Sequence, residues 1–194
     1  LQVLHEHGGR VLSAAFSPDC KFILTGSSDK NVRLWDLHGN LVKTFDARDA
    51  SVAAVAFSPG GNSFIAGLGN GTVRWWDLNG NRPRDFNGHK DRVYSVTFSR
   101  DGRHILTASK DGTVRLWNLK GKQFQVFRGH DAPVVAAAFT PGDTHIVTGS
   151  TDNTLRLWQL RGKELHVFTG HEDGVYSVAF STCGQQVLTG SKDR

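Results

Sequence analysis

Histidine, serine and aspartate recur together along this chain, and these three residue types could perform hydrolytic chemistry. One set consists of His89, Ser109 and Asp111, which supply a base, a nucleophile and an orienting carboxylate. The next set begins 41 residues further on, at His130. A catalytic site is normally built once in a protein, whereas this constellation is repeated. The pattern therefore predicts a structural role for these residues, no catalytic site, and a protein that is not an enzyme.

The same step of 41 residues governs the apolar positions. Tryptophan, valine and phenylalanine each keep it without an insertion or a deletion. The series are Trp35, Trp76, Trp117 and Trp158; Val11, Val52, Val93, Val134 and Val175; and Phe16, Phe57, Phe98, Phe139 and Phe180. A fixed period of this length is the signature of a repeat architecture.

Each period contains four short segments that are typical of β-strands. In the third period they are Val93–Ser99, which alternates apolar and polar residues, then His104–Ser109, Thr113–Leu119 and Gln123–Phe127. The Asp-Gly pair in Lys110–Gly112 favours a tight primed turn between the second and third strands. No segment has a helical pattern. The sequence predicts an all-β fold whose repeat is a meander of about the size of one propeller blade.

The third repeat, a GH pair followed by VYSVTFSRDGRHILTASKDGTVRLWNL, resembles the WD-repeat family, whose blades carry Gly-His and end on Trp-Asp. Trp-Asp is present at residues 35–36 and 76–77 and becomes Trp-Asn and Trp-Gln in the next two repeats. The resemblance covers the whole chain and implies a β-propeller of four-stranded antiparallel blades. More weakly, the connecting turns DLNGN, NLKGK and QLRGK resemble repeat arrays of bacterial, particularly cyanobacterial, multidomain signalling proteins.

About 4.7 periods fit into the 194 residues. The expected blades are 8–45, 49–86, 90–127, 131–168 and a partial blade at 172–194. We expect a segment of a longer ring, typically of seven blades, and self-association through unpaired edge strands is a further expectation. A small closed ring is the alternative.

The resemblance also implies a buried relay of hydrogen bonds in each blade. The residues that match it are His7, Ser27, Asp29 and Trp35; His89, Ser109, Asp111 and Trp117; His130, Ser150, Asp152 and Trp158; and His171, Ser191 and Asp193. A threonine two residues before each serine (Thr25, Thr107, Thr148 and Thr189) could take the serine's place. The sequence leaves that choice open.

The second blade departs from this pattern. Arg48, Ala66, Leu68 and Asn70 stand where the other blades have His, Thr, Ser and Asp, while Trp76 is kept. Loss of one relay member leaves its partners unsatisfied, whereas replacement of the whole set can be nearly neutral. We therefore expect this blade to be held mainly by apolar packing.

Four repeats carry an arginine at the same position of the third strand: Arg33, Arg74, Arg115 and Arg156. Their stems are expected to pack between blades while their heads reach solvent or a carboxylate. A phosphate-binding stripe is the alternative interpretation.

In the WD-repeat family, partners often dock around the central opening, on the face of the Gly-His loops. The matching positions that we select as partner-binding residues are Arg10, Leu12, Arg92, Tyr94, Lys110, Val135, Tyr176 and Lys192. Tyrosine and arginine are enriched at binding hot spots, so Arg92, Tyr94 and Tyr176 are the predicted anchors. The expected function is a protein–protein interaction scaffold that grips an acidic or aromatic-bearing peptide, within a larger sensory or regulatory signalling protein.

Charge and cysteine content limit the other classes of function. The net charge of +5 is spread along the chain without a run of basic residues, so nucleic acid is not an expected partner, and an RNA-associated propeller is the alternative function. Cys20 and Cys183 lie beside turn residues and have no metal-ligand spacing, which indicates free thiols, no metal or cofactor, and a reducing, cytoplasmic setting. No stretch of apolar residues could span a membrane, and no membrane partner is expected.

Overall fold

The computed structural model describes residues 3–48, 50–79, 83–181 and 183–193, and all regular elements in these ranges are β-strands. They form four sheets of four strands and one of two, each an antiparallel meander in chain order. We call these sheets blades 1 to 5. This confirms the predicted all-β fold of four-stranded propeller blades. The described residues include no helix long and apolar enough to cross a membrane.

In each four-stranded blade the chain passes from the first strand to the fourth, which lies outermost. Blade 1 contains β1 (Val11–Phe16), β2 (Phe22–Ser27), β3 (Asn31–Asp36) and β4 (Leu41–Asp46). Blade 2 contains β5 (Val52–Phe57), β6 (Ser63–Leu68), β7 (Val73–Asp77) and β8 (Arg84–Phe86). Blade 3 contains β9 (Val93–Phe98), β10 (His104–Ser109), β11 (Val114–Asn118) and β12 (Gln123–Phe127). Blade 4 contains β13 (Val134–Phe139), β14 (His145–Ser150), β15 (Leu155–Gln159) and β16 (Glu164–Phe168). Blade 5 contains β17 (Val175–Phe180) and β18 (Val187–Ser191).

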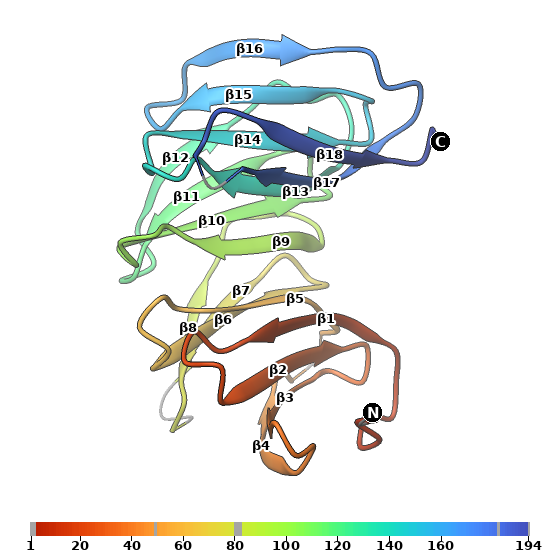
Figure 1. Ribbon diagram of the computed structural model, residues 1–194, viewed down its shortest axis with the longest axis vertical. Coiled ribbons are helices and arrows are strands. Elements are labelled where there is room, and N and C mark those ends of the chain that lie inside the picture. The colour runs from red at the N-terminus through yellow and green to blue at the C-terminus, as the bar shows by residue number, and fades with distance from the viewer. Residues whose placement is uncertain (1–2, 49, 80–82, 182, 194) are drawn as a thin grey trace.

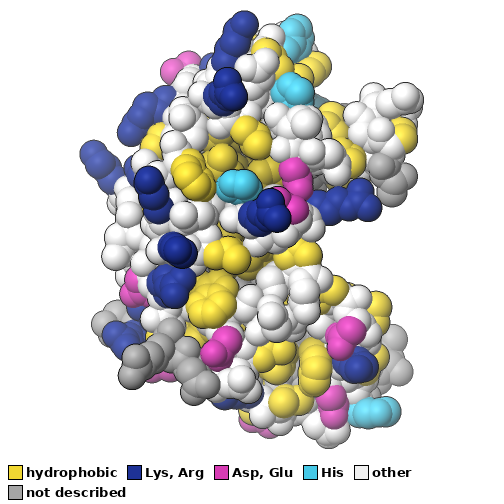
Figure 2. Space-filling model, turned by 90° about the vertical axis from the view of Figure 1, so that its left-hand side faces the viewer, with side chains coloured by type: hydrophobic (Ala, Val, Ile, Leu, Met, Phe, Trp, Pro, Cys, Tyr) yellow, Lys and Arg dark blue, Asp and Glu magenta, His cyan; other side chains and the backbone are white. Residues whose placement is uncertain are grey.

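The blades stand side by side in an open arc, with blade 1 at one end and blade 5 at the other (Figure 1). Successive first strands contact one another along the chain: β1 with β5, β5 with β9, β9 with β13 and β13 with β17. Seen from the end of the blades that carries the turns between third and fourth strands, the arc leaves a notch between its two ends (Figure 2).

A valine and a glycine join neighbouring blades. Val52, Val93, Val134 and Val175, which begin the first strands of blades 2 to 5, are completely buried. A Cβ placed on Gly67 of blade 2 would lie 2.7 Å from Val93 Cγ1 of blade 3. Gly26 of blade 1 and Gly149 of blade 4 meet the next valine in the same way, whereas blade 3 has Ala108 at this position. In three of the four junctions the second strand therefore lacks a side chain where the next blade's valine enters, and this close approach sets the spacing of the arc.

The turn between β10 and β11 differs from the prediction. The type I′ primed turn that an Asp-Gly pair favours needs positive φ at both central residues, but among Lys110, Asp111 and Gly112 only Gly112 has it, at 77°. The Gly112 N–H donates to the carbonyl of Ser109 at 3.2 Å, and the glycine follows the turn as a bulge residue. The prediction of a primed turn was wrong because Asp111 uses its side chain to bind the turn and keeps an ordinary negative φ.

Blade 2 is packed through aromatic rings. The indole of Trp76 stacks on Phe64 with ring centroids 5.1 Å apart, and Phe45 of blade 1 meets Phe64 edge-on at 4.7 Å. Ala66 and Leu68, at positions where other blades carry Thr and Ser, are buried in the same cluster. Apolar contacts thus occupy the space that the relay occupies elsewhere.

Candidate functional site

At one end of the molecule, a chain of side-chain hydrogen bonds ties the loops together in every blade except blade 2. In blade 4 the Trp158 indole N–H donates to Thr148 Oγ1 at 3.0 Å, and the Thr148 hydroxyl donates to His130 Nε2 at 2.8 Å. His130 Nδ1–H then donates to Asp152 Oδ2 at 2.7 Å. With this direction of donation, the indole N–H, the hydroxyl and both ring nitrogens of the relay each have a hydrogen-bond partner.

The same contacts recur in blades 1 and 3, and blade 5 has the histidine, threonine and aspartate. In blade 1 they join His7, Thr25, Asp29 and Trp35; in blade 3 His89, Thr107, Asp111 and Trp117; and in blade 5 His171, Thr189 and Asp193. Threonine is the central member in every case. The choice that the sequence left open is thereby resolved.

The serines named for this relay, Ser27, Ser109, Ser150 and Ser191, lie one step outside it. Ser109 Oγ, for example, donates to the carbonyl of Asp91 at 2.8 Å and accepts the Asp111 N–H at 3.1 Å. Their placement in the relay is corrected on simple geometric grounds. The serine side chain faces the loop backbone, whereas the threonine, two residues earlier on the same face of the strand, reaches the indole.

Burial and hydrogen bonding set the charges in the relay. Burial by itself raises the pKa of Asp111, but hydrogen bonds from His89 and Thr113 outweigh it and hold the pKa well below the ordinary range. The same balance lowers the pKa of Asp29 and Asp152. Burial lowers the pKa of His130, although Asp152 opposes the shift. In blade 4 these shifts favour a neutral His130 imidazole beside an ionised Asp152 carboxylate near neutral pH.

The aspartate also holds the Gly-His loop. Asp111 Oδ2 accepts the Lys90 N–H at 2.9 Å, and Asp152 Oδ2 accepts the Asp131 N–H at 3.2 Å. Each loop and the neighbouring turn between second and third strands are thus fixed against each other at one end of the blade. Loops held in this way form a firm rim around the centre of the arc.

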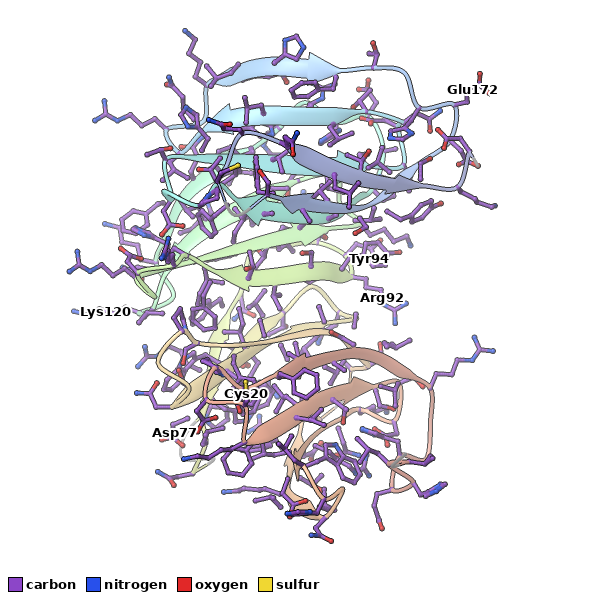
Figure 3. All side chains as sticks on the ribbon, in the orientation of Figure 1. Cys20, Asp77, Arg92, Tyr94, Lys120 and Glu172 are labelled. Carbon is purple, nitrogen blue, oxygen red and sulfur yellow. The ribbon has the colours of Figure 1, made fainter. Side chains whose placement is uncertain are left out.

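A hollow of about 470 Å³ opens at this end of the first strands. Its lining comes from all five blades: Leu12, Ala53, Arg92, Tyr94, Pro133, Val135, Thr151 and Tyr176. We call this hollow the central mouth. Figure 3 shows Arg92 and Tyr94 at the same end of the blades as Glu172, opposite the end that carries Cys20, Asp77 and Lys120.

The structure brings five of the eight partner-binding residues named from the sequence into the central mouth: Leu12, Arg92, Tyr94, Val135 and Tyr176. Lys110 lines an adjoining hollow of about 300 Å³, together with Arg92 and Tyr94. Arg10 and Lys192 are exposed and line neither hollow. The two tyrosines, two blades apart in the chain, share one cavity.

Arg92 lies at the junction of the two hollows. Its guanidinium carbon stands 6.0 Å from the centre of the Tyr94 ring, and its Nη2 donates to Ser51 Oγ of blade 2 at 3.2 Å. Lys110 Nζ lies 3.3 Å from a carboxylate oxygen of Asp91. Sequence reasoning missed Asp91, whose place directly before Arg92 in the loop was the available signal. This carboxylate offsets part of the positive charge at the rim.

The recurrent arginines pair mainly within their own blades. Arg33 contacts Asp29 at 2.6 Å, Arg74 contacts Asp85 at 2.7 Å, and Arg156 contacts Glu164 at 2.7 Å. Arg115 instead donates to the side-chain oxygen of Gln123. Three of the four heads reach a carboxylate, so this register does not form a row of unpaired cations for a phosphate.

Metal and thiol chemistry receive no support from the arrangement of side chains. Among the described residues, no group of three or more His, Cys, Asp or Glu side chains could hold a metal ion. Cys20 and Cys183 are exposed free thiols. In blades 1, 3 and 4 the histidine and aspartate of the relay are almost fully buried and bonded to each other, whereas His171 and Thr189 of blade 5 line an open hollow of about 480 Å³.

Comparison with protein families agrees with this architecture. A family model described as the IFT122 first beta-propeller matches residues 1–167. The chain belongs to this family of WD-repeat propellers. A second model, the WD domain, G-beta repeat, matches residues 162–194. WD-repeat propellers generally act as scaffolds for protein–protein interaction and are generally not enzymes.

Proposed function

We propose that this WD-repeat chain is a protein–protein interaction scaffold that binds a peptide or protein segment at the central mouth. The observation that carries the proposal is that five blades, each stiffened by its own contacts, contribute to one hollow. A concave site assembled from rigid elements, with apolar walls and few polar groups, is the usual form of a binding pocket. The chain has no catalytic role in this proposal.

The chemistry of the lining supports a partner that carries an aromatic or aliphatic side chain beside a carboxylate. Leu12, Val135 and the two tyrosine rings supply apolar and aromatic surface, of which Tyr176 is 51% exposed. Arg92 supplies a cation at the edge, and its side chain is already oriented by Ser51. Asp91 offsets Lys110, so Arg92 is the principal anion-binding group of the site.

The wider context follows from the same proposal. The scaffold would serve as the sensory or regulatory array of a larger signalling protein, in a reducing cytoplasm that keeps both exposed cysteines as thiols. Self-association is a further part of it. Val11 of β1 is 50% exposed and Leu188 of β18 is 75% exposed, and these surfaces could pack against those of a second copy.

Peptide selection followed by affinity measurement tests the proposal. A random-peptide phage library is panned on the purified chain, and the selected peptides are synthesised and measured by fluorescence anisotropy. Arg92→Ala and Tyr94→Ala are each expected to weaken binding by at least about 1 kcal/mol. Arg103→Ala, whose side chain is 82% exposed, is the matched control and should bind like the parent.

If both mouth variants fold and bind like the parent, the mouth is not the binding surface. The alternative of an RNA-associated propeller makes a different prediction. RNA binding would fall steeply with salt, with a slope set by the number of phosphates contacted.

A further inference from the structure

The outer strand of blade 3 differs from the other outer strands in its charge. β4 contains Asp46, β8 contains Asp85 and β16 contains Glu164, whereas β12 (Gln123–Phe127) carries no carboxylate. Exposed cations stand at both of its ends, with Lys120 and Lys122 before the strand and Arg128 directly after it. Among the fourth strands that the structure describes, β12 alone has basic residues at both ends and no acidic residue of its own.

The neighbouring blade adds to this charge. Gly162, in the turn before β16, packs against the side chain of Gln125, which brings the exposed Arg161 and Lys163 beside β12. Glu164 approaches the end of β12 at Gly129, but its carboxylate is held by Arg156 at 2.7 Å. Figure 2 looks onto the end of the blades that carries the turns between third and fourth strands. In its upper left part, Lys and Arg side chains are spread over the surface with few acidic side chains among them.

A buried cation behind the strand, Arg115, has no carboxylate partner in the part of the chain that the structure describes. Arg115 is 8% exposed and donates to Gln123, while its counterparts in blades 1, 2 and 4 contact Asp or Glu. Burial lowers the pKa of Arg115, and repulsion by Arg128 adds to that shift although Asp111 opposes it. The positive potential at β12 therefore comes from inside the blade as well as from its surface.

The backbone of β12 is open on its outer side. The strand is the last in its sheet and pairs only with β11 among the described residues. Phe124 on it is 51% exposed. An unpaired strand edge offers N–H and C=O groups that an extended polypeptide can use, and neither a nucleic acid nor a lipid can extend the ladder in this way. The flanking lysines disfavour pairing with a second, equally basic β12.

We infer that β12 is a second docking site, separate from the central mouth, which takes an extended acidic segment of a partner protein as a fifth strand of blade 3. Carboxylates of the segment would lie near Lys120, Lys122 and Arg128, and an apolar side chain would cover Phe124. Charge selects the partner, and the backbone ladder fixes its direction.

A defined peptide tests this inference. The probe is a fluorescein-labelled nine-residue peptide of alternating glutamate and valine, and its affinity for the full chain is measured by anisotropy. Lys120→Glu combined with Lys122→Glu is expected to weaken binding at least about ten-fold. The charge-matched control, Lys30→Glu combined with Lys90→Glu, changes exposed lysines at the opposite end of the blades and should leave binding unchanged.

Two further measurements separate strand addition from simple charge attraction. Methylation of alternate backbone nitrogens of the peptide, prepared in both phases, should abolish binding in one phase, and amide exchange along Gln123–Phe127 should slow in the complex. Gln123→Glu, which places a carboxylate where blade 4 has Glu164, should weaken binding without unfolding the chain.

Several outcomes would overturn the inference. They are equal binding of both methylated peptides, equal losses in the control variant, or lysine-dependent binding of single-stranded RNA or anionic vesicles with none of the peptide. Arg92→Ala should leave binding of the acidic peptide at β12 intact. The inference can therefore fail while the proposed function of the central mouth stands, and the central mouth can fail as a binding site while the inference stands.

Discussion

Thr148 is the centre of the relay in blade 4, and its replacement by valine tests whether the relay stabilises the fold. The side chain is completely buried, and its oxygen joins two groups, the indole N–H of Trp158 at 3.0 Å and Nε2 of His130 at 2.8 Å. Thr148→Val keeps the shape of the side chain and replaces that hydroxyl with a methyl group. The change leaves a buried donor and a buried acceptor without a partner.

The expected loss in the free energy of unfolding follows from these two groups that lose their hydrogen-bond partner. Each unsatisfied buried group costs about 1–3 kcal/mol, and the added methyl group returns about 0.8 kcal/mol by its burial. We expect a net loss of about 3 kcal/mol in the free energy of unfolding. Thr151→Val in the next turn is the matched control, because Thr151 is half-buried and its hydroxyl makes one long contact of 3.4 Å. That variant should lose less than about 1 kcal/mol.

Urea unfolding followed by tryptophan fluorescence and by far-ultraviolet circular dichroism measures both variants. The midpoint should fall for Thr148→Val while the slope stays that of the parent. Equal losses in the two variants, or a loss below about 0.5 kcal/mol at Thr148, would refute the reasoning, since the relay would then contribute no more than a surface hydroxyl.

Three other outcomes are expected. Gln123→Glu should stabilise blade 3 by about 0.5–1 kcal/mol at neutral pH in thermal unfolding, because it gives Arg115 the carboxylate that Arg156 has in blade 4; an unchanged or lowered stability contradicts this. Gly67→Ala should cost about 1–3 kcal/mol by forcing Val93 aside, whereas Gly142→Ala, with open space around it, should cost less; equal costs would contradict the close packing of blades. The free energy of unfolding should fall as the pH drops below 6.5, because His130 is protonated in the unfolded chain while its pKa in the native protein is lowered. It should fall further near pH 4, where the unfolded chain takes up protons on Asp111 and Asp152, whose native pKa is lowered. A stability that does not change with pH contradicts both shifts.

Periodicity was sufficient to predict most of the fold. The bounds predicted for His104–Ser109 and Gln123–Phe127 agree with β10 and β12, because each segment is apolar, alternating and closed by turn residues. The turn at Lys110–Gly112 was predicted wrongly. An Asp-Gly pair favours a primed turn in isolation, but here tertiary contacts of Asp111 with the Gly-His loop decide the backbone.

The candidate site was predicted in part. The 41-residue period put Tyr94 and Tyr176 at one register, directly after the recurrent valine, and both line one hollow in the structure. Sequence spacing could not distinguish Thr148 from Ser150, because both point to the same face of the strand and only the depth of the Trp158 indole separates them. The ion pair of Asp91 with Lys110 needed three-dimensional distances.

The central claim is that a partner segment is held at the central mouth by several blades at once. Amide chemical-shift mapping of a phage-selected peptide on the isotope-labelled chain tests it most directly. The account predicts that the largest changes fall together on Leu12, Tyr94, Val135 and Tyr176, which four different blades contribute. Changes confined to a single blade, or to the opposite end around Lys120, would contradict it.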